Sequence, residues 1–176
     1  GRSYVVYADA HYVLELPEGS TVDFELFKSQ IAGLLTGLTR QDAVSESAIE
    51  EITGCLAAYR GDLMPKSRFV PLIAEAREQL RSVYLDALEK LAERLIKEED
   101  YTAAVRILEP GLRHDPLWGE GVQLFIEAAA RNGQLFRALR VYRDYQKNLN
   151  EELGLDPDQT MKDLLARLMH VRSEDE

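Results

Sequence analysis

The sequence has few of the features that mark secreted, metal-binding or membrane-spanning proteins. Its 176 residues include a single cysteine, Cys55, which cannot form a disulfide within the chain and offers no pattern for a metal site. No apolar run approaches the ~20 residues needed to cross a bilayer. The chain begins with Gly1-Arg2-Ser3, which is not a signal peptide and stands where a Met is expected. We therefore expect a soluble cytoplasmic domain cut from a longer protein.

Basic residues are also in the minority. The chain has 21 Lys and Arg against 31 Asp and Glu, a formal net charge of −10. A surface that follows nucleic acid needs dense Lys and Arg, so the acidity argues against a chain whose whole surface binds nucleic acid. The length suits one domain, and a chain of this size can bury about 70% of its extended-chain surface without metals or disulfides.

After residue 20 the sequence has the periodicity of amphipathic helices. Apolar residues recur at steps of three and four, which predicts seven helices near residues 23–38, 47–59, 69–96, 101–114, 116–132, 134–152 and 157–168. Ser47, Asp115 and Asp156 are the predicted caps of three of them. Residues 4–7 and 12–14 are β-prone and predict a small hairpin. The expected fold class is all-α, with tetratricopeptide-like antiparallel helix pairs and a short N-terminal β-hairpin.

Two segments 34 residues apart share an alternation of large and small side chains. The first carries Leu88, Leu91, Ala92, Leu95, Ala104, Leu108, Gly111 and Pro116, and the second carries Val122, Phe125, Ile126, Ala129, Ala138, Tyr142, Tyr145 and Asn150. This spacing is typical of a tetratricopeptide unit, in which small residues let helices approach and large ones fill the grooves. Tyr145 and Asn150 depart from the pattern. An ordinary antiparallel bundle, which also alternates large and small residues, is the alternative.

The residues that most often carry catalysis are scattered. His11, His114 and His170 lie in distant segments, and none has a second ligand at a recognised metal spacing. The glycines occur singly and form no phosphate-binding loop. We predict no catalytic, cofactor or metal site. A helical hydrolase would require His114 or His170 to meet a carboxylate and a nucleophile in one cleft.

One predicted helix carries a basic stripe, at Arg137, Arg140, Arg143 and Lys147. Residues 131–147 include five basic residues and one acid, a local net charge of +4, whereas residues 148–176 include three basic and eight acidic residues, a net of −5. The stripe is either a solvated face that partly neutralises its neighbour or a contact face for an acidic partner surface, such as the acidic tail of a second copy. Trp118, the only Trp, suits a packing anchor, and it is a contact candidate because aromatic anchors are enriched at interfaces.

Several short motifs occur from residue 59 onward. They are Tyr59-Arg60-Gly61-Asp62-Leu63, Asn132-Gly133, Ala138-Leu139, Tyr142-Arg143 and the run Glu151-Glu152-Leu153-Gly154-Leu155-Asp156-Pro157. Together they resemble the bacterial transcriptional activator domain, which follows the DNA-binding region in regulators of antibiotic synthesis and their relatives. The resemblance implies a regulatory domain that contacts proteins and self-associates, and it supplies no catalytic residues.

The N-terminal segment extends this resemblance. His11-Tyr12-Val13-Leu14, followed by Val22-Asp23 and Phe27, is similar to the junction that leaves a winged-helix DNA-binding domain. The expected division is residues 1–20 as a hairpin or winged-helix remnant, 21–172 as the helical activator domain, and 173–176 as a polar tail. The expected partner is the transcription machinery or a second copy in a homodimer, without cofactor or membrane. The rival function is a tetratricopeptide scaffold that binds a peptide or small effector, without a direct transcription role.

Overall fold

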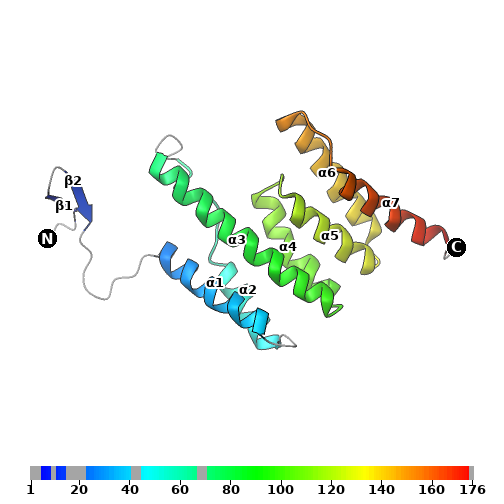
Figure 1. The fold of residues 1–176 in the computed structure, drawn as a ribbon, viewed down its shortest axis with the longest axis horizontal. Coiled ribbons are helices and arrows are strands. Elements are labelled where there is room, and N and C mark those ends of the chain that lie inside the picture. Colours follow the sequence, from blue (N-terminus) through cyan, green and yellow to red (C-terminus); the bar gives the residue numbers. More distant parts are fainter. Residues whose placement is uncertain (1–4, 9–10, 15–22, 41–44, 67–70, 175–176) are drawn as a thin grey trace.

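The computed structural model describes residues 5–8, 11–14, 23–40, 45–66 and 71–174 (Figure 1). Within these ranges the expected all-helical architecture is confirmed, with α1 (Asp23–Arg40), α2 (Glu46–Leu56), α3 (Pro71–Lys97), α4 (Tyr101–His114), α5 (Gly119–Arg131), α6 (Leu135–Leu153) and α7 (Gln159–Glu174). Strands β1 (Val5–Ala8) and β2 (His11–Leu14) pair antiparallel, with Val5 opposite Leu14. The expected turn of the hairpin, at residues 9–10, lies outside the described residues, as do positions 175–176 of the expected polar tail.

Helix α3 organises the molecule. Its 27 residues span about 40 Å at 1.5 Å per residue, and Pro71 occupies its first position, where no backbone donor is needed. Figure 1 shows α3 crossing the molecule, with α1 and α2 on one side and α4 and α5 on the other. The remaining helices continue the stack, because α6 packs on α5 and α7 also contacts α5.

A single hydrophobic core runs from α1 to α7. Its centre lies between α3, α4 and α5, where Leu91, Leu108 and Phe125 are at most 1% exposed. Small residues stand where helices cross: Ala104 of α4 and Ala138 of α6 are fully buried. An alanine at a crossing lets two helix backbones approach closely, so the larger neighbours interdigitate.

Three of the expected helix caps are wrong. The side chain of Ser45, two residues before Ser47, accepts a 3.2 Å hydrogen bond from the backbone N–H three residues on and caps α2. Asp158 rather than Asp156 does the same for α7, at 2.8 Å. Asp115 accepts a 3.0 Å bond from the N–H two residues on and shapes a turn, and α5 begins only afterwards, at residue 119. At α2 and α7 two Ser or two Asp residues lie close together, and the local backbone decides which one can cap.

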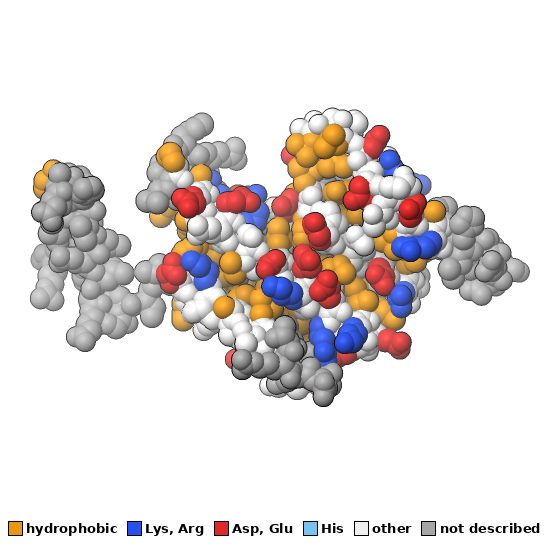
Figure 2. Space-filling model, in the orientation of Figure 1, with side chains coloured by type: hydrophobic (Ala, Val, Ile, Leu, Met, Phe, Trp, Pro, Cys, Tyr) orange, Lys and Arg blue, Asp and Glu red, His pale blue; other side chains and the backbone are white. Residues whose placement is uncertain are grey.

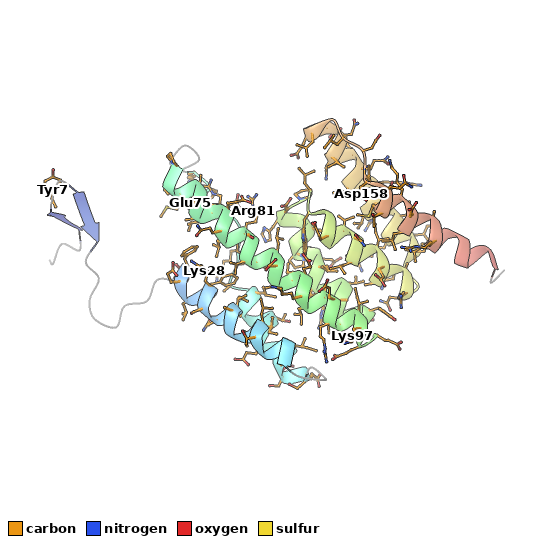
Figure 3. The ribbon with its side chains drawn as sticks, in the orientation of Figure 1. Tyr7, Lys28, Glu75, Arg81, Lys97 and Asp158 are labelled. Carbon is orange, nitrogen blue, oxygen red and sulfur yellow. The ribbon has the colours of Figure 1, made fainter. Side chains whose placement is uncertain are left out.

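The turn that follows α2 is tied to α3 by two arginines. Arg81, labelled in Figure 3, makes a two-pronged contact with the Asp62 carboxylate at 2.6 and 2.7 Å. One turn earlier on the helix, Arg77 donates to the carbonyls of Leu63 and Met64, both at 2.9 Å. These bonds satisfy backbone acceptors in an irregular segment and fix its course over the core.

Candidate protein-contact surface

The basic stripe lies on α6, and its members do not all face the same way. Ala138, Tyr142 and Leu149 face the core, whereas Arg140, Arg143 and Lys147 are exposed on the other side. Lys147 lies 3.9 Å from Glu151 of the same helix. Among the described residues, Arg140 and Arg143 form no ion pair. Three cations therefore project from one helical face.

Arg137 differs from the other three members of the stripe. Its guanidinium forms an ion pair with Glu109 of α4, lies 5.4 Å from the centre of the Phe125 ring of α5, and donates at 2.9 Å to the Gln134 side chain. These contacts join α6 to α4 and α5. Arg137 is thus occupied within the domain, and the outward basic face is defined by Arg140, Arg143 and Lys147.

Trp118 is enclosed in the fold, with 6% of its surface exposed. Its indole lies against Gly111 of α4 and Gly121 of α5: a Cβ added to Gly111 would stand 2.6 Å from the ring, and one added to Gly121 would overlap it. Both glycines are buried. The ring packs between two helices, which agrees with the packing role favoured by the sequence, and it is not part of the outward basic face.

A cleft of about 200 Å³ opens beside Arg137, between α4, α5 and α6. Its apolar lining includes Leu112, Val122, Phe125 and Val141, and its charged lining consists of Arg113, Arg137, Arg140, Glu109 and Asp144. Arg140 belongs both to this lining and to the exposed face. The cleft and the basic face are therefore one continuous surface. Sequence reasoning did not single out Arg113 or Glu109, because both come from α4.

Several carboxylates lie close together where α3 meets α5, and one of them, Asp86, pairs with Lys90 at 3.0 Å. Figure 2 shows acidic side chains over these helices, near the middle of the view. Burial, together with the charges of Glu93, Glu120 and Asp86, raises the pKa of the Glu89 carboxyl. Carboxylates that crowd one another in this way would repel an acidic partner. The outward face of α6 is therefore a basic region on an acidic chain.

The other reactive side chains serve packing. His114 lies edge-on to the rings of Tyr59 and Tyr84, with centroids 5.2 and 5.7 Å away, and the two tyrosines stack at 4.1 Å. The side chains of His11 and His170 lie outside the described residues. Burial, and then the charge of Glu51, raises the pKa of the Cys55 thiol.

Over the described ranges, no group of three or more His, Cys, Asp or Glu side chains could hold a metal ion, and no helix is long and apolar enough to cross a membrane.

The stacked tyrosines should make the free energy of unfolding depend on pH in the alkaline range. Burial, and then the neighbouring Tyr59, raises the pKa of Tyr84 to about 12 from its usual 10. The folded protein therefore holds this proton more tightly than the unfolded chain, so the contribution is complete below pH ~10 and is lost as pH rises towards 12. We expect Tyr84→Phe to weaken the fall in unfolding free energy across this window, measured by urea denaturation. If the unfolding free energy falls equally steeply with pH in both proteins, the raised pKa of Tyr84 is not its cause.

The described residues form an all-helical domain that carries an exposed basic face on α6. The sequence also matches the family model of the bacterial transcriptional activator domain over residues 22–169. The chain belongs to this family, which confirms the resemblance drawn from its motifs.

The fold is also found in a solved structure. Mycobacterium tuberculosis EmbR, in complex with a low-affinity phosphopeptide, has 23% sequence identity and a TM-score of 0.64. The similarity covers 95% of this chain and 43% of that chain, so this chain spans less than half of the EmbR structure. The search of curated proteins found no significant match.

Proposed function

We propose that this chain is the contact domain of a bacterial transcriptional activator and that it docks through Arg140, Arg143 and Lys147 on an acidic surface. The surface belongs to the transcription machinery or to a second copy of the chain, in the cytoplasm, and DNA is reached through a domain outside this chain. The observation that carries the proposal is the exposure of these three cations on one face of α6. Long-range attraction between opposite surface charges guides association and orients the partners.

The domain organisation supports the same proposal. The family model begins at residue 22, close to the expected boundary after residue 20, and the similarity to EmbR extends beyond the range that the model matches. We propose that residues 1–20 are the remnant of a winged-helix domain, that 21–172 form the activator domain, and that 173–176 are a polar tail. The chain would then connect a DNA-reading domain with a protein-contacting one.

The tetratricopeptide-like arrangement stays a proposal with structural support. Of the positions that the 34-residue period relates, Leu88, Leu91, Ala92, Leu95, Ala104, Leu108, Gly111, Val122, Phe125, Ile126, Ala129, Ala138 and Tyr142 are all buried. Tyr145, which breaks the large-and-small pattern, is only partly buried. Units that stack in this way leave their outer helices free to contact other proteins.

Reversing the charge of the basic face tests the proposed function. We expect Arg140→Glu/Arg143→Glu/Lys147→Glu to weaken self-association, or binding to bacterial RNA polymerase holoenzyme, by at least about tenfold at low salt, because three attractions become repulsions. The difference should narrow at physiological salt, where exposed charges are screened. Sedimentation equilibrium measures the first interaction and biolayer interferometry the second.

The matched control is Arg106→Glu/Lys162→Glu/Arg167→Glu, which reverses three exposed cations on α4 and α7. Both variants carry the same net charge, so a general repulsion would affect them equally. The proposal predicts near-native affinity for the control. Equal affinities in the face variant and the wild type, or the absence of both interactions in the wild type, would contradict the proposal.

A further inference from the structure

We infer that the cleft between α4, α5 and α6 receives one bulky apolar side chain of an acidic helical segment from a partner protein, while Arg113, Arg140 and Arg143 pair with carboxylates of that segment. This inference rests on the proposed function, because it uses the same α6 face. It adds the chemistry of the partner, which is an acidic helix that carries an apolar anchor.

The cleft has the size and the lining for an apolar anchor. Its volume is about 200 Å³, and an apolar cavity of about 150 Å³ is large enough to bind benzene. Val122 and Phe125, which contribute to the lining, are 2% and 1% exposed and belong to the core. The site is therefore formed before a partner arrives, and little ordering is needed when a side chain enters it.

The charges at the cleft favour an acidic partner. Arg137 and Glu109 neutralise each other. The contact with the Phe125 ring holds Arg137 in place as one wall of the cleft. Arg113 and Arg140 are exposed and form no ion pair within the described part of the chain. Asp144 contributes a single opposing charge to the same lining. Two guanidinium groups are thus available to carboxylates placed on either side of an inserted side chain.

The basic residues continue past the cleft at a spacing that suits a helix. From Arg140 to Lys147 the α6 axis advances about 10 Å, roughly two turns. Carboxylates at steps of three and four on a partner helix would meet this row when the helix lies along α6. The crowded acids around Glu89 on α3 and α5 would repel the same segment. Attraction to the α6 face and repulsion from the acidic cluster would together give the segment a defined docking position.

A synthetic peptide tests the chemistry directly. The probe is an end-capped, fluorescein-labelled peptide of about 16 residues, long enough to form helix in water, with Glu at every third or fourth position and one central Phe. We expect the chain to bind it at low salt, measured by fluorescence anisotropy. Replacing the peptide Phe by Ala should weaken binding by about tenfold, and this comparison uses the unaltered protein.

Two variants of the chain locate the anchor. Val141→Phe fills the cleft and keeps every cation, so we expect it to weaken binding of the Phe peptide by about tenfold and to leave the Ala peptide unchanged. Leu135→Phe enlarges a partly buried residue of the same helix that does not line the cleft, and it should bind as the wild type does. Circular dichroism melting confirms that both variants are folded.

The outcomes separate this inference from the function on which it rests. If the Phe and Ala peptides bind equally, or if Val141→Phe has no effect, the anchor is wrong although the basic face still docks by charge. If no peptide binds up to about 1 mM while charge reversal on α6 still abolishes a protein contact, the acidic helix is the wrong partner and the proposed function survives. If charge reversal also has no effect, both fail.

Discussion

Replacing Trp118 by alanine should lower the free energy of unfolding by about 3–5 kcal/mol, the range for deleting a large buried aromatic side chain. The indole is 6% exposed and fills the space between α4 and α5, against Gly111 and Gly121. Because both of these positions are glycine, neither has a side chain of its own to fill the gap. Urea denaturation followed by circular dichroism measures the loss, and a change below ~1 kcal/mol would contradict this packing.

A double-mutant cycle with Gly121 makes this prediction more specific. In the wild type a Cβ at Gly121 overlaps the indole, so Gly121→Ala should cost about 1–3 kcal/mol through overpacking. With Trp118→Ala the overlap disappears, and the same substitution should gain up to ~1 kcal/mol, because alanine favours a helix over glycine. The sign of the Gly121→Ala effect should therefore change with residue 118. Additive effects would show that the two positions do not touch.

Removing the carboxylate that Arg81 binds should cost about 2–3 kcal/mol of unfolding free energy, as expected for a charged hydrogen-bonded contact. The side chains of Arg81 and Asp62 are 26% and 35% exposed, so the loss is smaller than for a fully buried pair. Asp62→Ala leaves Glu78, at 3.9 Å, as the remaining acid beside Arg81. The turn over residues 61–64 should then open, which hydrogen exchange detects as faster exchange there than in α3.

Two further variants separate charge from shape at this contact. Asp62→Asn keeps the shape and loses the charge, and we expect most of the destabilisation of Asp62→Ala. Arg81→Met in the Asp62→Ala background should cost little more, since the guanidinium has already lost its main partner. If Asp62→Ala lowers the free energy of unfolding by less than ~0.5 kcal/mol, the pair contributes no more than an ordinary exposed ion pair.

The helices were predictable because their pattern is local. Apolar residues at steps of three and four identified α4 with both of its ends, and α6 ends at Leu153, one residue beyond the predicted end, with Gly154 at φ +67° as its cap. Caps were less predictable, as Ser47 and Asp156 show, because capping depends on the backbone angles of one residue among several similar candidates. The tertiary arrangement then decides which of two neighbouring residues has the right geometry.

The contact surface was predictable only in part. Spacing alone placed four cations on one helix, but consecutive members lie about 60° or 40° apart around the axis, and the sequence does not say where the neighbouring helices stand. The structure turns Arg137 towards Glu109, which is 28 positions earlier in the chain, and leaves Arg140 outside. The cleft combines residues of three helices, so a pattern within any one helix contains no signal for it.

If the chain docks through α6 as proposed, Arg140 and Arg143 contact the partner directly. The most direct measurement is arginine-specific chemical modification read by mass spectrometry, with the chain free and bound to RNA polymerase holoenzyme or to itself. We expect Arg140 and Arg143 to lose reactivity in the bound state, while Arg106 and Arg167, exposed on α4 and α7, keep theirs. Unchanged reactivity at Arg140 and Arg143, with protection elsewhere on the domain, would contradict it.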